Sequence, residues 1–482
     1  MNFLEKLIAA GRFILLQGGM GIWASAWFLA REMALADEIG TVSGTAIHIV
    51  FARQLQLGDP GGHKKRAVDA FPFQEISQRI YRKYFIQGGK GVDKSFVNIE
   101  MFTFACSREL IELIILANFA EVYLAKEGHD GIVGINFLEK VQIPHLYSIY
   151  GAMLAEVDFI VVGAGVPKQF PGVIDNFMNG ESSEYKIDVV GAKSGSFAMH
   201  FDPREFFGGL SLPELKRPCF IPIITSASIA LRMKDQHPGK IDAFVVEGVT
   251  AAGHNSPPRI KGCFDACGNP IYGYKDGTDF GVMRSLGIPF ILAGGYSNPK
   301  KVAEARQLGA CGVQVGSIMA LADQSGIAPN IRKMARMLAF RHELQVITSL
   351  VASPTGYAFK IARLSGTLSD SVVYENRKRI CDIGLLRTPY LRADGKLGYR
   401  CSAEPMDVYV AKGGDARECE GTISLCNGLF SVVDLAQIRS NGYIEPAVLT
   451  LADDTEFVRH LMSDEDGSYS VNDVVAYLRS GI

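Results

Sequence analysis

The stretch IPFILAGGYSNPKKVAEARQLGACGVQVGS, residues 288–317, carries the clearest structural pattern in the chain. Two short apolar runs stand at its ends, and each finishes in glycine or another small residue. Between them lies a helical pattern with Asn298 as its cap, Pro299 in its first turn and Gly309 near its end. Continuous apolar runs, as opposed to alternating ones, indicate strands that are buried on both faces. The stretch therefore predicts two parallel strands joined by a helix.

The same pattern recurs along the chain. The predicted strands are Arg12–Gly19, Ile39–Thr45, Gly131–Asn136, Asp158–Gly165, Cys219–Ser226, Ile241–Gly248, Ile288–Gly295 and Gly312–Ser317. Eight such strands alternating with helices predict an α/β protein of the (β/α)8 TIM-barrel type. The alternative is an open doubly wound sheet with the dinucleotide-binding segment VVGAGVPK, which ends at Lys168. That fingerprint fails, because Lys168 takes the place of its third glycine and Pro167 interrupts the turn.

Three stretches exceed a minimal barrel. We expect a barrel over residues 1–350, with a helical insertion at about 50–130 and a β-hairpin insertion at about 185–203. Residues 351–482 are rich in turn-forming residues and predict a C-terminal extension that packs on the barrel.

Composition narrows the classes of partner. The chain has 482 residues, of which 48% are hydrophobic and 21% charged, and its net charge is -2. This balance is typical of a soluble globular protein and gives no reason to expect nucleic acid or membrane as a partner. The apolar segment after Phe13 is broken by Gln17 and several glycines, so we expect no membrane span. We expect a cytoplasmic enzyme with a small-molecule substrate, in which a homodimer is possible.

The nine cysteines have irregular spacing, which favours a reducing compartment. Cys381, Cys401, Cys419 and Cys426 lie in the tail without any C-x-x-C pair, so packed thiols are expected there and no metal.

The ends of the last two predicted strands carry a candidate phosphate site. In TIM barrels, phosphate often binds at the loops after the seventh and eighth strands. Here these loops contain Gly294 and Gly295, and then Gln314, Val315, Gly316 and Ser317. Glycines allow backbone N–H groups to approach a phosphate closely.

Other strand ends offer room for a flat ligand. Gly19, Met20 and Gly21 follow the first strand, and Asn136 ends the third with both a donor and an acceptor. A planar cofactor with a phosphate tail would use all of these groups. FMN fits better than NAD, since no acidic residue that would bind a ribose follows a glycine fingerprint.

The sixth strand is followed by the candidate catalytic residue. Glu247 closes this strand, and Ala251, Ala252 and Gly253 keep the next turn small. His254 then stands at the expected mouth of the barrel, where the small residues leave space for a ring system. A histidine can accept a proton at neutral pH.

These motifs together resemble the nitronate monooxygenase family, also called 2-nitropropane dioxygenase-like proteins, which is related to the FMN-dependent enoyl-[acyl-carrier-protein] reductases. The motifs on which the resemblance rests are AAGH ending at His254, AGGY ending at Tyr296 and GVQVGS ending at Ser317. The segments GHNSPPR and SPTGYAFK resemble a longer bacterial branch of the family. The resemblance covers about residues 13–323.

The resemblance implies non-covalently bound FMN. It implies that Gly294, Gly295, Gln314, Gly316 and Ser317 hold the phosphate end. It also implies that Gly19, Met20, Gly21 and Asn136 lie against the flavin ring, and that His254 is the catalytic base.

The chain departs from the family pattern at three places. Ala252 replaces a glycine, Ser317 replaces a threonine, and Glu247 stands where many relatives have glutamine. A carboxylate beside the flavin would disfavour an anionic reduced ring. We therefore expect Glu247 to be paired or the flavin to be shifted.

The implied activity is oxidation of alkyl nitronates with O2 to carbonyl compounds and nitrite. Two alternatives remain open at this point. One is an NAD(P)H-dependent FMN enoyl-[acyl-carrier-protein] reductase that acts on an enoyl thioester, for which Lys64, Lys65 and Arg66 could form a basic entrance. The other is a non-catalytic flavoprotein.

Overall fold

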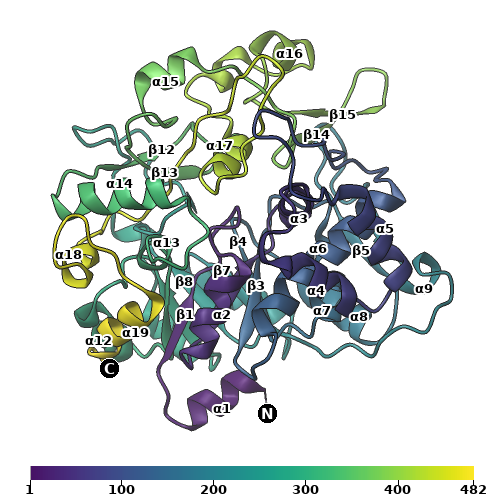
Figure 1. The fold of residues 1–482 in the computed structure, drawn as a ribbon. Helices are drawn as coiled ribbons and strands as arrows, with labels where there is room; N and C mark the ends of the chain where they lie inside the picture. The colour runs from purple at the N-terminus through teal and green to yellow at the C-terminus, as the bar shows by residue number, and fades with distance from the viewer. Residues whose placement is uncertain (1) are drawn as a thin grey trace.

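The computed structural model describes residues 2–482, and a parallel β-barrel lies at its centre (Figure 1). Its strands are β1 (Ile14–Gln17), β2 (Gly40–Ser43), β3 (Val133–Leu138), β4 (Phe159–Gly163), β7 (Cys219–Ile224), β8 (Phe244–Glu247), β10 (Phe290–Ala293) and β11 (Gly312–Val315). The pairing order is β1-β11-β10-β8-β7-β4-β3-β2, and every neighbouring pair is parallel. A parallel bridge between Leu16 and Ile39 joins β1 to the start of β2 and closes the ring. The predicted TIM barrel is confirmed. Seven of the eight strands lie within the ranges expected from the sequence, and β3 extends two residues beyond its expected end at Asn136.

Helices surround the strands. They are α2 (Trp27–Leu35), α6 (Arg108–Lys126), α7 (His145–Leu154), α8 (Phe170–Met178), α10 (Ala227–Gln236), α11 (Phe280–Ser285), α12 (Pro299–Gln307) and α19 (Val471–Arg479). The predicted caps of α12 are present: Asn298 accepts a hydrogen bond from the N–H of Lys301, and Pro299 occupies the first helical position.

The barrel interior forms its own apolar core. Inward side chains include Ile14, Phe159, Ile221, Val245 and Ile291. The short helix α1 (Phe3–Ala9) packs Leu4 against this core at the end of the barrel where the strands begin. The opposite end, where the strands finish, is left for a site.

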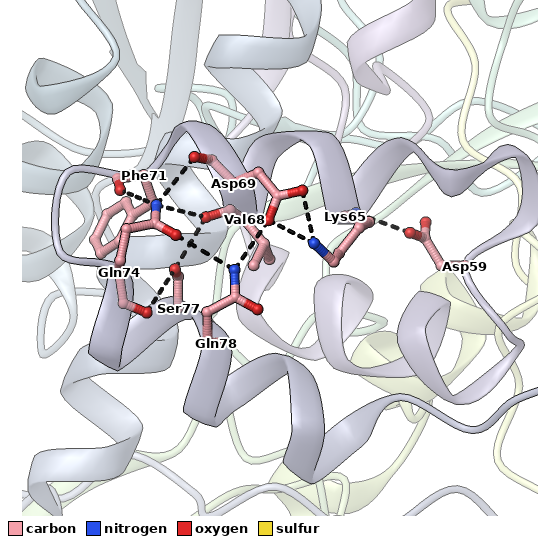
Figure 2. A network of polar contacts seen from close by, with 8 residues as sticks. All are labelled: Asp59, Lys65, Val68, Asp69, Phe71, Gln74, Ser77 and Gln78. Atoms are coloured by element: carbon pink, nitrogen blue, oxygen red, sulfur yellow. Dashed lines mark hydrogen bonds and ion pairs between the residues drawn. The ribbon is translucent and has the colours of Figure 1, made fainter.

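The helical insertion contains α3 (Ile47–Gln56), α4 (His63–Ala70) and α5 (Gln74–Tyr84). Figure 2 shows the polar contacts that join α4 to α5. Gln74 donates to the carbonyl of Phe71 at 2.6 Å, and Ser77 donates to the carbonyl of Val68 at 2.9 Å. The carbonyl of Phe71, the residue after α4, gains a donor in this way, and the carbonyl of Val68 gains one in addition to the N–H of Phe71. The turn between the two helices is thereby fixed.

Helix α6, the last helix in the range 50–130, belongs to the barrel, unlike α3, α4 and α5. It packs along α2 and α7 and precedes β3, which is the position of a barrel helix. Its fully buried residues, such as Leu116 and Ala120, reflect contacts on several sides. The residues that are additional to the barrel therefore end before Arg108.

The predicted β-hairpin is confirmed. Strands β5 (Ser183–Lys186) and β6 (Ala198–Phe201) pair antiparallel, with Tyr185 opposite Met199. Both of these side chains are buried, and the hairpin packs on α7 and α8.

The tail leaves the barrel and returns to it. After β11 and the short helix α13 (Ser317–Ala320), the chain forms α14 (Pro329–Phe340), β12 (Val346–Ser349) and β13 (Ala358–Ala362). It continues through α15 (Ser371–Asn376), β14 (Thr388–Leu391), β15 (Leu397–Arg400), α16 (Met406–Ala411), α17 (Leu425–Ser431) and α18 (Phe457–Leu461).

The final helix, α19, then packs beside both α12 and α2 (Figure 1). This is the place of the helix that follows the eighth strand of a barrel. Arg479 fixes it there through hydrogen bonds to the carbonyl of Phe13 at 2.9 Å and to Glu38 at 2.6 Å.

Within the described residues, no helix is both long enough and apolar enough to span a membrane.

Candidate active site

A cavity of about 230 Å³ opens at the end of the barrel where the strands finish. The structure brings all of the residues predicted for the site together around it. They are Gly19, Met20, Gly21, Asn136, Glu247, Ala252, Gly253, His254, Gly294, Gly295, Gln314, Val315, Gly316 and Ser317. The cause is the parallel sheet, which places the carboxyl ends of all its strands at one edge. Their individual roles stay predictions.

The loop after β10 requires its two glycines. Gly294 and Gly295 have φ angles of +83° and +81°, a region that side chains with a Cβ rarely adopt. A Cβ on Gly294 would also lie 3.0 Å from the carbonyl oxygen of Gly248. This tight packing keeps the loop close to the neighbouring strand end and leaves the cavity open above it.

The expected phosphate end is shaped by backbone and hydroxyl groups. Ser317 begins α13, and its Oγ accepts a hydrogen bond from the backbone N–H of Ala452 at 2.7 Å. Since this bond uses the oxygen as acceptor, the hydroxyl proton remains available to a ligand. Among the described residues that line the cavity there is no lysine or arginine. A bound phosphate would therefore be held by neutral donors.

Asn136 anchors the loop after β1. Its Nδ2 donates to the carbonyl of Gly19 at 2.7 Å. Its Oδ1 is buried and has no hydrogen-bond partner in the described part of the chain. An unpaired buried acceptor is costly, which is typical of a position where a ligand supplies the missing donor.

Glu247 lies in the cavity without a partner. No group within residues 2–482 forms a hydrogen bond or ion pair with its carboxyl, so the expected pairing is not found. Burial raises the pKa of this carboxyl to about 8. Glu247 is therefore mostly protonated at neutral pH.

His254 is held by the tail of the chain. It forms the two-residue strand β9 (His254–Asn255), which pairs antiparallel with β13. Its Nε2 lies 2.7 Å from the hydroxyl of Ser353, and its ring packs edge-on against Phe359 at 4.9 Å. Burial, with a smaller effect of nearby Lys140, lowers the pKa of His254 to about 4. The ring is thus neutral at pH 7 and able to accept a proton.

The outer wall of the cavity comes from the tail, which sequence reasoning did not find. It is almost wholly apolar and consists of Phe359, Leu385, Leu386, Leu425, Cys426, Leu429, Val432, Val448, Leu449, Thr450 and Ala452. The sequence predicted that the tail packs on the barrel. No motif indicated which of its residues reach the strand ends.

The tail segment 448–452 crosses over the site, and we call it the strap. Thr450 Oγ1 accepts a hydrogen bond from the N–H of Gly253 at 2.8 Å. Buried Lys360 holds the end of the strap, because its Nζ lies 2.7 Å from the carboxylate of Asp453. The strap therefore joins the His254 loop to the phosphate loop.

The basic residues considered as an entrance lie elsewhere. Lys64, Lys65 and Arg66 are on α4 and do not line the cavity. Lys64 is buried in an ion pair with Glu121, while Lys65 and Arg66 pair with Asp69 and Glu127. The ion pairs of Lys64 and Arg66 bind the insertion to α6 of the barrel and the residue after it, and that of Lys65 lies within α4. The hypothesis of a basic entrance is therefore wrong.

The comparison with protein families matches a segment that contains much of this site. Residues 174–357 match the family model described as nitronate monooxygenase. This segment includes Glu247, His254, the two candidate phosphate loops and Ser353. The match agrees with the expected resemblance over these residues and indicates an oxidoreductase. No curated protein matches the chain.

Solved structures give weaker similarities. FabK from Thermotoga maritima has 16% identity and a TM-score of 0.49, with 97% of this chain and 92% of that chain covered. Nitroalkane oxidase from Streptomyces ansochromogenes has 14% identity and a TM-score of 0.42, with 97% and 95% covered.

Proposed function

We propose that the protein binds FMN in this cavity and oxidises alkyl nitronates with O2 to carbonyl compounds and nitrite. The observation that carries the proposal is the convergence of every predicted cofactor-binding group and His254 on one cavity. The family match over residues 174–357 supports the same reaction class.

The residues present fit FMN. The unpaired Oδ1 of Asn136 suits an N–H on the edge of a flavin ring, and the free proton of Ser317 suits a phosphate oxygen. The glycines after β10 and β11 line the same cavity, and glycine allows backbone N–H groups to approach a phosphate closely. Bound FMN would supply the electron acceptor for substrate oxidation and return electrons to O2.

The protein's own groups would bind and orient the substrate. The apolar wall of the tail excludes water and accepts the alkyl part of the nitronate. His254, neutral at pH 7, would accept the α-proton when a neutral nitroalkane enters in place of its nitronate. The hydroxyl of Ser353 would fix the orientation of the imidazole ring.

One observation favours the enoyl reductase as a second candidate. The wall formed by the tail is almost wholly apolar, and it would equally accept the acyl chain of an enoyl thioester. In that reaction NAD(P)H would reduce the FMN, and hydride would then pass to the substrate.

A single experiment separates the candidates. The flavin absorbance of the purified protein is followed without oxygen after addition of propyl nitronate, NADH or NADPH to separate samples. Prompt bleaching by nitronate alone, with nitrite released when oxygen returns, supports the monooxygenase. Bleaching by a nicotinamide alone favours the reductase. A flavin-loaded protein that responds to none of them contradicts both.

A further inference from the structure

The carboxyl of Glu247 has an unusual position. The side chains of β8 alternate, and Val245 points into the barrel core. Glu247 stands two residues later on the same face, so its carboxyl caps the inward side of the strand at the floor of the cavity. Its backbone neighbour in the sheet is Ala293, which is too small to cover it.

The cavity around this carboxyl contains no compensating charge. Among the described residues that line the cavity, Glu247 is the single carboxyl, and neither lysine nor arginine is present. The other titratable groups that face the cavity are His254 from β9, Tyr296 from the loop after β10 and Cys426 from α17. Burial lowers the pKa of His254 and raises those of Tyr296 and Cys426, so all three are neutral at pH 7.

Glu247 also lines a second, neighbouring cavity, to which Tyr272 and Asp276 add further titratable groups and which likewise has no lysine or arginine among its described lining residues. A buried carboxylate without a partner would be costly, whereas a buried carboxylic acid needs only an acceptor for its proton. No acceptor within residues 2–482 takes that proton. The residue is half-buried, so water can accept the proton while the active-site cavity is open, and a ligand that fills this cavity takes the place of that water.

We propose that Glu247 acts as a neutral carboxylic acid whose O–H donates a hydrogen bond to an acceptor atom on the ring edge of the bound flavin. The inference rests on the proposed function only in requiring a flavin, and not on the substrate that the flavin oxidises. It resolves the conflict seen in the sequence, because a neutral acid neither needs an ion pair nor repels an electron-rich ring. The flavin can then lie directly against β8.

The proposal predicts how flavin affinity depends on pH. The acid form binds, and the ionised form has lost the proton that it would donate. The pKa of about 8 therefore sets the pH above which affinity falls. If only the acid form binds, the dissociation constant of FMN rises by about tenfold per pH unit well above that pKa.

The test is a titration of apoprotein with FMN, followed by quenching of flavin fluorescence between about pH 6.5 and 9.5. Wild type is compared with Glu247→Gln, whose amide N–H can donate at the same place but does not titrate. We expect the dissociation constant of wild type to rise above about pH 8 and that of Glu247→Gln to stay flat over the same range. Ionisation of FMN itself affects both proteins equally and therefore cancels in the ratio of their dissociation constants.

A third protein isolates the hydrogen bond. Glu247→Met has a similar length but no donor, so we expect weaker FMN binding than Glu247→Gln at every pH, without the rise above pH 8. Equal affinities of these two variants would overturn the proposal, as would parallel pH curves for wild type and Glu247→Gln.

The outcomes also separate this inference from the proposed function. Nitronate oxidation by a wild type whose FMN affinity does not change with pH overturns only the role of Glu247. Failure of wild type to bind FMN at pH 7 overturns both.

Discussion

At the scale of single residues, the environment of His254 suits a nitronate better than a neutral nitroalkane as the substrate. Its pKa of about 4 leaves the ring neutral at pH 7 but makes it a weak base. A nitronate has already lost its α-proton and needs no base. A neutral nitroalkane must lose that proton in the site.

We therefore expect His254→Asn to retain FMN and to oxidise propyl nitronate at close to the wild-type rate. Turnover of neutral nitroalkanes should fall by about 10²- to 10⁴-fold, the usual contribution of a general base. Steady-state oxygen consumption with each substrate measures both rates. A colourless variant would show instead that the ring is needed for FMN binding, and equal losses on both substrates would exclude a role confined to proton removal.

Ser353 is expected to act through His254. Its hydroxyl, 2.7 Å from Nε2, also contacts the hydroxyl of Thr355 at 2.8 Å. Ser353→Ala removes the partner that can accept a proton from the charged ring, so the pKa of His254 should fall further. We expect kcat/KM for a neutral nitroalkane to drop up to about tenfold, as one hydrogen bond is worth about 0.5–1.5 kcal/mol.

The pH profile separates this role from a structural one. The acidic limb of kcat/KM should move to lower pH in Ser353→Ala and return in Ser353→Thr, which restores the hydroxyl. An unmoved limb, with the same loss of rate at every pH, would contradict the positioning role.

At the scale of elements, the helical insertion is fixed to the barrel by a buried ion pair. Glu121 of α6 contacts Lys64 of α4 and accepts hydrogen bonds from the indole of Trp23 at 3.2 Å and the backbone N–H of Trp27 at 3.1 Å. One carboxylate therefore joins α4, α6 and the segment after β1. That segment begins with the loop that lines the cavity.

Lys64→Met should lower the free energy of unfolding by about 3–5 kcal/mol, because it leaves the Glu121 carboxylate buried with no opposite charge. The matched control is Lys65→Met, on the same helix. Lys65 pairs with Asp69 at the surface, where such a pair contributes only about 0.3–0.5 kcal/mol. Urea denaturation of both variants provides the measurement, and similar losses for the two would show that the buried pair has no special importance.

The parts of the fold that sequence predicted are those governed by local patterns. An apolar run such as Phe290–Ala293 is recognisable because a strand buried on both faces has no polar positions. The turn glycines, such as Gly294, are recognisable because the backbone there excludes other residues. The candidate site followed from these two signals and from the order of the strands.

The parts that sequence missed depend on contacts between distant segments. Ser353 reaches His254 only because β13 pairs with β9, and residues such as Leu429 reach the cavity only through the packing of the tail. The ion pair of Lys64 could not be predicted from the sequence either, because its partner Glu121 lies 57 residues away in the chain. No periodicity within one segment records such pairings.

At the scale of the whole molecule, barrel and tail are interleaved. The tail follows β11 in the chain, and its last helix, α19, packs between α12 and α2. The strap bonds to Gly253 and Ser317, which lie on two different barrel loops. The tail cannot unfold without opening the cavity and removing support from the helix that completes the barrel.

We therefore expect a single unfolding transition in which calorimetry and the release of flavin fluorescence coincide. Leu478→Ala in α19 should lower the temperature of both signals together, because truncating a fully buried leucine costs about 2–5 kcal/mol. The exposed substitution Asn472→Ala, in the same helix, should leave both nearly unchanged. Two results would mean that the tail and the barrel are independent units. One is two separate transitions in wild type. The other is a flavin signal in Leu478→Ala whose transition temperature is unchanged while that of the heat absorption falls. A joint shift would show that the stability of the active site depends partly on α19. Arg479, the last residue of this helix, donates a hydrogen bond to the carbonyl of Phe13, which directly precedes β1 of the barrel.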